Sequence, residues 1–322
     1  MDGKIAIEEH FVTPELADLV YNPGWPADAF RAALDRLEDT DGPRLHAMDR
    51  NGIEVAVLSL AANGIQDEPD PRRAAQRAAE ANDALAQIVA THPDRYAGFG
   101  AVALQDPEAA AAEAARAVRE LGFRGVLVNG YSSVGDLDTA DYYDDPKFWP
   151  FWERIEALDV PFYLHPRNPL PGQRRIYEGR PELLGPTWAF GVETATHALR
   201  LITSGLFDRF PRLCVILGHL GEGLPFALHR LEQRLQRIPE VRLGKPATHY
   251  LRDNFYVTTS GNYHTASLVG LLLQLGADRL MFAADYPFEE PEDGARWFDE
   301  LAISDLDREK IGRLNAERLL RL

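Results

Sequence analysis

Short apolar runs recur along the whole chain, and most of them are continuous rather than alternating. Eight runs have the length of a strand: residues 4–8, 53–60, 96–103, 124–128, 160–164, 213–217, 254–260 and 279–284. Continuous apolar strands are typical of a parallel sheet whose two faces are both covered. The pattern therefore predicts eight buried parallel strands.

Amphipathic segments of helix length follow these runs, over 72–92, 107–120, 147–158, 193–206, 223–237, 265–275, 292–303 and 306–320. The second of them begins with Asp106 and Pro107, an N-cap residue followed by proline at the first helical position. A repeated strand and helix is typical of a closed (β/α)₈ barrel, a TIM-like fold of the α/β class. No low-complexity linker divides the chain, so we expect residues 1–322 to form a single domain.

Two longer segments interrupt this rhythm. Residues 18–45 begin with a turn-rich stretch before an amphipathic one, and residues 166–192 contain five prolines and four glycines. Long connections inside a compact domain are usually lids or binding loops. Both segments follow strands with candidate functional side chains, so we expect them to be loop insertions beside the site.

Composition excludes several classes of function. A net charge of −16 argues against nucleic acid or an anionic membrane as partner. The single cysteine, Cys214, lies in an apolar run, which rules out an intrachain disulfide and predicts a buried thiol. The first ten residues lack a signal-peptide pattern, and no run of about 18 apolar residues could cross a bilayer. We therefore expect a cytoplasmic protein.

Acidic and imidazole side chains stand at the ends of several predicted strands. Glu8 and His10 are spaced i and i+2, so they project from the same face of a strand. His165, His219 and Asp285 follow three other apolar runs. The carboxyl ends of barrel strands meet at one face, so these distant residues should converge there.

Two carboxylates and two imidazoles, from Glu8, His10, His165 and Asp285, suit Zn²⁺ or Mn²⁺ and are too rich in nitrogen for Ca²⁺. A lone histidine at a strand end is more often a hydrogen-bonding or surface residue, but four candidates at one face favour a metal site. His219 is a further ligand or a neighbour of one. We interpret five of the remaining histidines as surface or packing residues: His46, His92, His197, His229 and His249. The role of His264 is left open.

Six collinear segments carry longer motifs: Gly3–Phe11, His165–Pro171, Leu183–Phe190, Ile216–Pro225, Thr258–Asn262 and Asp285–Glu289. Through them the whole chain resembles the amidohydrolase superfamily, in its branch of metal-dependent non-oxidative decarboxylases. Within that branch it most resembles the γ-resorcylate (2,6-dihydroxybenzoate) decarboxylase family. Hydrolases of the superfamily begin with His-x-His, whereas this chain has Glu8-x-His10, which favours the decarboxylase branch.

The resemblance implies one divalent ion, Zn²⁺ or Mn²⁺, held by Glu8, His10, His165 and Asp285. It also implies that His219 and Glu222 hold and tune Asp285 as catalytic neighbours, and that the chain forms a homotetramer or homodimer. The implied reaction is reversible decarboxylation of an ortho-hydroxybenzoate, such as 2,6-dihydroxybenzoate, 2,3-dihydroxybenzoate or salicylate. CO₂, or bicarbonate in the reverse direction, is then the second small molecule.

Loss of CO₂ from an aromatic ring requires a proton on the ring carbon first, because the departing electron pair would otherwise lack π stabilisation. Asp285 is the candidate acid. It must be protonated at that moment, either by proton uptake linked to substrate or through a pKa raised by apolar surroundings and the neighbouring Glu222. The metal would serve as Lewis acid and template.

A flat substrate also requires aromatic walls. Six aromatic residues after the relevant strands are candidates, each of which could instead pack a loop: Phe11, Trp25, Trp188, Phe190, Tyr286 and Phe288. Arg167 and Asn168 could contact substrate or staple the loop, and the surrounding prolines favour the second role for Arg167.

The chain departs from the family pattern at Ala283–Tyr286, at Tyr263-His264 and around Asn63–Gln66, which leaves the hydroxybenzoate isomer open. Two alternatives to a decarboxylase remain. One is a metal-dependent hydrolase of a lactone or cyclic ester on the same barrel, and the other is a barrel without catalysis that serves as a binding protein.

Overall fold

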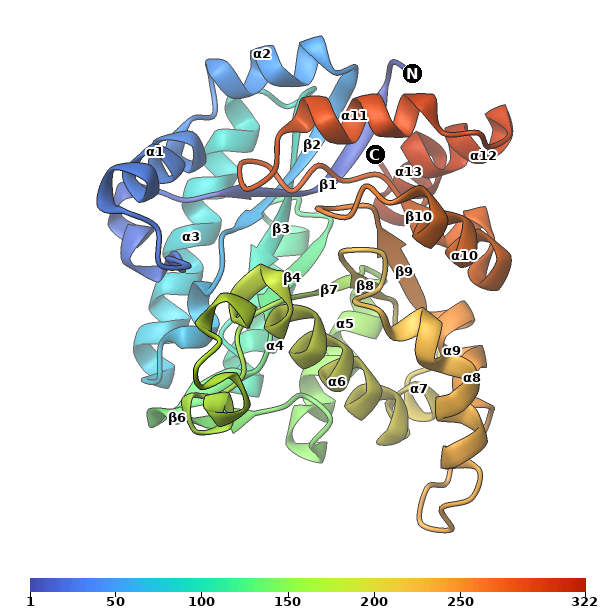
Figure 1. Cartoon of the computed structure of the whole chain (residues 1–322). Helices are drawn as coiled ribbons and strands as arrows, with labels where there is room; N and C mark the ends of the chain where they lie inside the picture. Colours follow the sequence, from blue (N-terminus) through green and yellow to red (C-terminus); the bar gives the residue numbers. More distant parts are fainter.

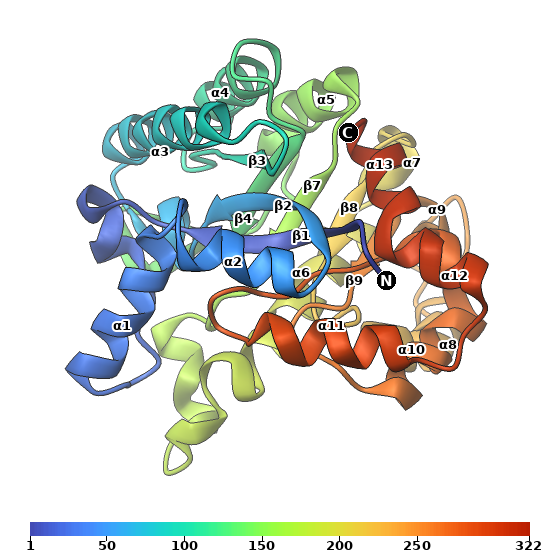
Figure 2. The same ribbon diagram turned by 90° about the horizontal axis from the view of Figure 1, so that it is seen from above.

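The computed structural model describes residues 1–322, and its main element is an eight-stranded parallel sheet surrounded by helices (Figures 1 and 2). Each strand pairs with the next barrel strand along the chain. In spatial order the strands are β1 (Lys4–Phe11), β2 (Ile53–Leu60), β3 (Tyr96–Ala101), β4 (Gly125–Asn129), β7 (Phe162–His165), β8 (Val215–Leu217), β9 (Phe255–Thr258) and β10 (Leu280–Met281). The predicted (β/α)₈ barrel is confirmed.

The barrel closes through irregular backbone rather than through a regular ladder. β10 has only two residues and pairs with β9 alone. β1 instead bonds the segment that follows β10: Ile7 N donates to Phe282 O (3.3 Å), Asp285 N to Glu8 O (3.0 Å) and His10 N to Tyr286 O (2.8 Å). The segment that carries Asp285 therefore completes the barrel.

The surrounding helices agree with the predicted segments to within a few residues, apart from the last, and two short helices were not predicted. The surrounding helices are α3 (Pro71–Thr91), α4 (Pro107–Arg119), α5 (Trp149–Leu158), α6 (Ala189–Thr203), α7 (Leu206–Arg209), α8 (Leu224–Leu235), α9 (Ala247–Asn254), α10 (Thr265–Leu275) and α11 (Pro291–Glu300), of which α7 and α9 are the two that were not predicted. The Asp106 side chain caps α4 by accepting from the main-chain N–H groups of Glu108 and Ala109, both at 3.1 Å.

The single helix predicted over 306–320 is wrong in detail. It consists of α12 (Asp305–Glu309), a π-helical turn (Lys310–Leu314) and α13 (Asn315–Leu320). The Ile311 carbonyl accepts a hydrogen bond at 2.8 Å from Phe282 N, directly after β10, which ties the turn to the barrel. This contact places the C-terminal helices beside β1, as Figures 1 and 2 show.

The two interrupting segments have structure of their own. Residues 18–45 contain α1 (Ala27–Glu38) and the start of α2 (Pro43–Arg50). Residues 166–192 contain three short 3₁₀ turns and the start of α6. An antiparallel hairpin of β5 (Ser132–Val134) and β6 (Asp136–Asp141) was not predicted, because β6 is polar and largely exposed.

The core has two layers. Inside the barrel lies a cluster that includes Ile5, Ile7, Phe99 and Tyr163, and two larger clusters fill the space between the strands and the helices. Cys214 is partly buried against the inner cluster, and burial raises the pKa of its thiol to about 12. None of the helices combines the length and the apolar character that a membrane crossing requires.

Candidate active site

A β-bulge in β1 aims the first two candidate ligands into the barrel. Between Ala6 and Glu9, β1 has one more residue than the facing stretch of β2. Side chains otherwise alternate along a strand, so without the bulge Ile7 and Glu8 would face opposite ways. With the bulge, Ile7 fills the barrel interior and Glu8 and His10 lie above it at the mouth.

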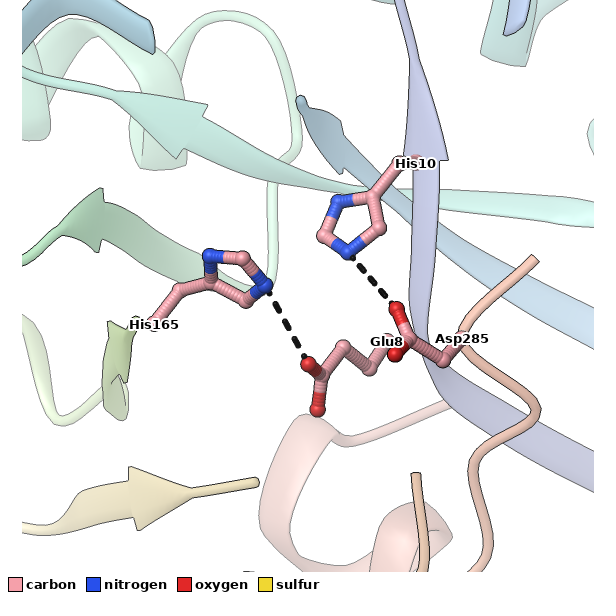
Figure 3. A group of neighbouring side chains, drawn as sticks. All are labelled: Glu8, His10, His165 and Asp285. Carbon is pink, nitrogen blue, oxygen red and sulfur yellow. Dashed lines mark ion pairs between the residues drawn. The ribbon is translucent and has the colours of Figure 1, made fainter. Parts of the chain in front are cut away.

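The structure brings the four predicted ligands together at that mouth (Figure 3). All four residues are buried, and one ligand atom from each lies within 4.8 Å of the others. His10 Nε2 lies 3.3 Å from Asp285 Oδ1, and His165 Nε2 lies 3.3 Å from Glu8 Oε1. Three barrel segments far apart in the sequence therefore contribute to one cluster.

The donor atoms of this cluster fit a divalent cation. Glu8 Oε1, His10 Nε2 and Asp285 Oδ1 are buried and have no hydrogen-bond partner. Buried polar atoms are otherwise almost always paired, so three converging orphans point to an ion as their missing partner. His165 offers its Nε2, because its Nδ1 lies 2.7 Å from Asn129 Oδ1 and donates to it. Such a second hydrogen bond is typical of a metal-binding histidine.

The other oxygen of Glu8 is held by three hydroxyl groups that the sequence analysis did not single out. Tyr163, Thr258 and Ser260 all donate to Glu8 Oε2. Gly218 packs against the same carboxylate, since a Cβ atom there would lie 2.8 Å from Oε2. Tyr163 precedes His165 by two residues in β7, and that spacing was a signal for a shared face.

Charges at the site favour metal binding. Burial opposes ionisation of Glu8, but the neighbouring imidazoles of His219 and His165 outweigh burial and hold the pKa of this carboxyl well below its usual range. Burial lowers the pKa of His165, which keeps its ring neutral and its Nε2 lone pair available. An ionised carboxylate and a neutral imidazole are the forms that bind a metal.

Asp285 is linked to the groove at the barrel mouth through two further side chains. His219 Nε2 lies 3.4 Å from Asp285 Oδ2, and His219 Nδ1 lies 2.6 Å from Glu222 Oε1. Glu222 thus contacts His219 and reaches Asp285 only through that ring. Burial disfavours the charged imidazole, but Glu222 and the other carboxylates overcome it and raise the pKa of His219 well above its usual range.

The expectation of a raised pKa for Asp285 is wrong. Burial does raise the pKa of this carboxyl, but the adjacent imidazoles of His10 and His219 outweigh burial and leave the pKa below its usual value. Asp285 is therefore ionised in the free protein. Of the two routes that the sequence left open, proton uptake linked to substrate is the one compatible with this geometry.

The backbone around His219 and Asp285 is left-handed. His219 has φ of 50° and Asp285 of 61°, and the four residues after His219 also have positive φ. Residues other than glycine avoid this region, so such a run marks a segment fixed by its surroundings. Gly261 packs against both residues: a Cβ atom there would lie 3.1 Å from Asp285 Oδ2.

A groove of about 600 Å³ leads from solvent to His219 and Glu222, between α6 and α8. Trp188 and Phe190 line it, as the sequence predicted for aromatic walls. Phe288 lies at the ligand cluster itself, with its ring centroid 5.7 Å from that of His10. Whether these three residues bind substrate stays a prediction.

The other three aromatic candidates lie elsewhere. Phe11 packs in the outer core, on the side of β1 opposite to the ligands. Tyr286 is buried beneath the guanidinium groups of Arg36 and Arg44, at 4.9 and 4.6 Å. Trp25 is exposed in its loop. No contact in the structure connects these three side chains with the ligand cluster.

Arg167 and Asn168 staple loops in the structure. Arg167 donates to the Tyr131 carbonyl (2.6 Å) and to Asp67 Oδ1 (2.6 Å), and Asn168 Oδ1 accepts from Gly185 N (2.7 Å). Among the remaining histidines, His197 is buried and accepts from Tyr143 N at 3.2 Å. His264, which the sequence left open, is exposed and lies 2.9 Å from Ser267 Oγ.

Comparison with known proteins agrees with this site. The profile of the amidohydrolase family matches residues 9–322. The γ-resorcylate decarboxylase of Rhizobium sp. (strain MTP-10005) is 50% identical over 326 residues, which cover 100% of this chain and 99% of that protein.

Two crystal structures are closely similar. A 2,6-dihydroxybenzoate decarboxylase complexed with 2,6-dihydroxybenzoate has a TM-score of 0.96 at 50% identity, covering 100% of both chains. A dihydroxybenzoic acid decarboxylase from Polaromonas sp. JS666, with bound manganese and the inhibitor 2-nitroresorcinol, also has a TM-score of 0.96 at 50% identity, covering 100% of this chain and 98% of that one. The chain therefore belongs to the amidohydrolase family, and within it to the branch of aromatic-acid decarboxylases that contains the γ-resorcylate decarboxylases.

Proposed function

We propose that this protein is a metal-dependent carboxy-lyase that decarboxylates an ortho-hydroxybenzoate reversibly, with 2,6-dihydroxybenzoate as the leading substrate. The observation that carries the proposal is the buried cluster of Glu8, His10, His165 and Asp285, with three unpartnered atoms, in a chain similar over its full length to decarboxylases of this acid. The similar proteins are decarboxylases, so they support this reaction and not lactone hydrolysis or a binding role without catalysis.

We assign the metal position to the same four residues, with Mn²⁺ as the first candidate because a similar structure contains manganese. A divalent ion bound there supplies a Lewis acid that stabilises negative charge on the substrate oxygens. The chain itself supplies a fixed set of donor atoms. Hydroxyl groups hold Glu8 and the Asn129 amide holds His165, so little reorganisation is needed for binding.

Asp285 is the proposed proton carrier. Its carboxylate accepts the proton of the ortho-hydroxyl group and delivers it to the ring carbon that bears the carboxylate. When the bond between the ring and CO₂ breaks, its electron pair returns to the ring and restores aromaticity. The ring is then a phenolate, and the one proton that the net reaction consumes restores its hydroxyl group. His219 can pass that proton to Asp285 across 3.4 Å, and Asp285 can pass it to the phenolate oxygen. Glu222 connects His219 with the groove, and so with solvent.

The groove between α6 and α8 supports a second part of the proposal, a homotetramer or homodimer. Trp188, which lines the groove, and Phe226, on α8, are 60% and 56% exposed, although large apolar side chains are usually covered. We place the protein in the cytoplasm, where CO₂ or bicarbonate is the second reactant. Light scattering that shows only a monomer would contradict the oligomer without affecting the reaction.

The decisive experiment combines substrate profiling with metal analysis on one preparation. Release of CO₂ is measured from 2,6-dihydroxybenzoate, 2,3-dihydroxybenzoate and salicylate, and release of acid is measured from an aromatic lactone. We expect decarboxylation of at least one hydroxybenzoate, loss of activity with a chelator and recovery with Mn²⁺. Lactone hydrolysis without any CO₂ release from a metal-loaded sample would refute the proposal.

A further inference from the structure

Glu9 stands between two proposed metal ligands in the sequence but points away from them. The bulge in β1 turns Glu8 and His10 into the barrel, so Glu9 faces the outer layer, where it is 4% exposed. A carboxylate this deeply buried is costly unless its oxygens are bonded. Both are: Oε1 accepts from Ala284 N at 2.9 Å and Oε2 accepts from Tyr286 N at 3.3 Å.

The two N–H groups that Glu9 binds flank Asp285. Asp285 itself has a left-handed backbone, which a residue other than glycine adopts only where its neighbours hold it. The neighbours on both sides are therefore fixed by one carboxylate. Main-chain bonds from Asp285 N to Glu8 O and from His10 N to Tyr286 O complete the attachment. Glu9 thus makes two of the four hydrogen bonds that join residues 284–286 to residues 8–10.

Regular pairing does not replace these bonds. The ladder of β10 ends at Met281, four residues before Asp285, and β10 does not pair with β1. Beyond Met281 the position of the segment is set by contacts of individual residues and not by a strand ladder. The Glu9 carboxylate is the side chain among them that binds on both sides of Asp285.

Arg44, on α2, binds the backbone of His10, as Glu9 binds the backbone on both sides of Asp285. It is 2% exposed, and its Nη2 donates to the His10 carbonyl at 2.6 Å. Its guanidinium also covers the Tyr286 ring, with 4.6 Å from Cζ to the ring centroid. Glu9, Arg44 and Tyr286 line one small cavity of about 10 Å³ behind β1. Glu9 and Arg44, both buried, thus lie on the same side of β1, directly behind the ligands.

We propose that Glu9 is a positioning residue of the metal centre, which sets the backbone of Asp285 through the N–H groups of Ala284 and Tyr286, and that Arg44 does the same for His10. The inference extends the proposed function, because it assumes that Asp285 and His10 bind the metal. It assigns no contact between Glu9 and substrate.

Glu9→Gln tests this directly. Glutamine keeps the shape of the side chain but has one acceptor oxygen, so one of the two N–H groups loses its partner. Partners behind the metal ligands typically contribute about 10-fold to 100-fold to metal affinity or activity. We therefore expect the dissociation constant of Mn²⁺, measured by electron paramagnetic resonance, to rise about 10-fold or more. At saturating Mn²⁺, kcat should also fall, with little change in KM.

Asn315→Ala is the matched control. Asn315 Nδ2 donates to the carbonyls of Ala277 and Leu280, both at 2.7 Å, so it holds the other end of the same segment with the same number of bonds. We expect this variant to have a lower Tm but unchanged Mn²⁺ affinity and kcat. If both variants lose Mn²⁺ affinity in proportion to Tm, Glu9 is only part of the scaffold and the inference is overturned.

Two further outcomes are decisive. Wild-type Mn²⁺ affinity and kcat in Glu9→Gln would overturn the inference. If that variant does not fold, Arg44→Lys replaces it: lysine keeps the charge but loses the planar donor to His10, so weaker Mn²⁺ binding supports the inference and unchanged binding overturns it. A wild-type protein that binds Mn²⁺ but decarboxylates no hydroxybenzoate would refute the proposed function alone, since Mn²⁺ affinity still decides the role of Glu9.

Discussion

The two sides of the barrel mouth hold their functional side chains in different ways. Glu8, His10 and His165 project from strands that are paired along their length, although β1 has a bulge at Glu8. His10 pairs with Ser59 and His165 with Asn129 in the neighbouring strands. His219 and Asp285 follow strands of three and two residues and have a left-handed backbone. The first side is fixed by the sheet, and the second by contacts of individual residues.

This difference matches a difference in proposed roles. The residues on regular strands only donate lone pairs, and a strand places such atoms within narrow limits. Asp285 and His219 must also move a proton, and His219 lies where the groove reaches the site. The comparison predicts that changes on the irregular side affect the chemical step most, whereas changes on the regular side affect metal affinity.

Asp285→Asn should have the largest effect on the chemical step. An amide neither accepts the phenol proton nor delivers one, so we expect kcat to fall by about 10²-fold to 10⁴-fold. Mn²⁺ and substrate should still bind, more weakly, through the three remaining ligands. Asp278→Asn removes an exposed carboxylate that pairs with Lys310 and should leave kcat unchanged. A kcat within tenfold of wild type in Asp285→Asn would remove Asp285 from the acid role.

Gly218→Ala tests how tightly the Glu8 carboxylate is held. The added Cβ atom would lie 2.8 Å from Glu8 Oε2, so the carboxylate must shift and Mn²⁺ affinity should fall by about 10-fold to 100-fold. Gly205→Ala is the control, because Gly205 has φ of 80° and no atom within 4 Å of the added Cβ. That variant should lose about 1–2 kcal/mol of stability and no Mn²⁺ affinity. Equal Mn²⁺ affinities in the two variants would show that Glu8 has room to move.

The regular side of the mouth was predictable from sequence, and much of the irregular side was not. Continuous apolar runs located every strand of the barrel, and the i, i+2 spacing of Glu8 and His10 placed them on one face. The pattern could not show the bulge, which depends on how β1 pairs with β2. Phe11 was expected at the site because the predicted strand ended at residue 8. In the structure β1 continues to Phe11, and alternation from His10 places Phe11 in the outer core.

The segment after β10 shows the limit most clearly. Asp285 was identified from its position after an apolar run, but its ionisation depends on the adjacent imidazoles of His10 and His219, which no local pattern reveals. Glu9 was read only as part of a motif, since its partners are main-chain groups 275 and 277 residues away. Contacts of this kind require the fold to be known.

Asn129→Ala probes the regular side with a smaller expected effect. Without the acceptor at 2.7 Å from Nδ1, the His165 ring can rotate, and Mn²⁺ affinity should fall by about 10-fold. Ser59→Ala is the internal comparison. Ser59 Oγ lies 3.3 Å from His10 Nδ1, and this longer hydrogen bond should contribute less to the orientation of the His10 ring. Measured Mn²⁺ dissociation constants should rank Asn129→Ala above Ser59→Ala. Wild-type affinity in both would mean that the strands alone orient the two rings.

Substitution of His197 should have the smallest effect on catalysis. It tests how the stability of the fold depends on pH, apart from the chemistry of the site. This residue is buried on α6, and burial lowers its pKa from 6.5 to about 3. Between these values the unfolded chain binds a proton at His197 and the folded chain does not, so stability falls as the pH falls, by about 1.4 kcal/mol per pH unit. In His197→Gln this contribution disappears, while the amide oxygen still accepts a hydrogen bond from Tyr143 N and activity at pH 7 is unchanged. Urea unfolding at pH 7 and pH 5 should therefore show a loss for wild type that exceeds the loss for the variant by about 2 kcal/mol. Equal losses of unfolding free energy in the two proteins would mean that other groups, those of the site among them, make the fold sensitive to acid. Variants on the two sides of the mouth could then not be compared at low pH.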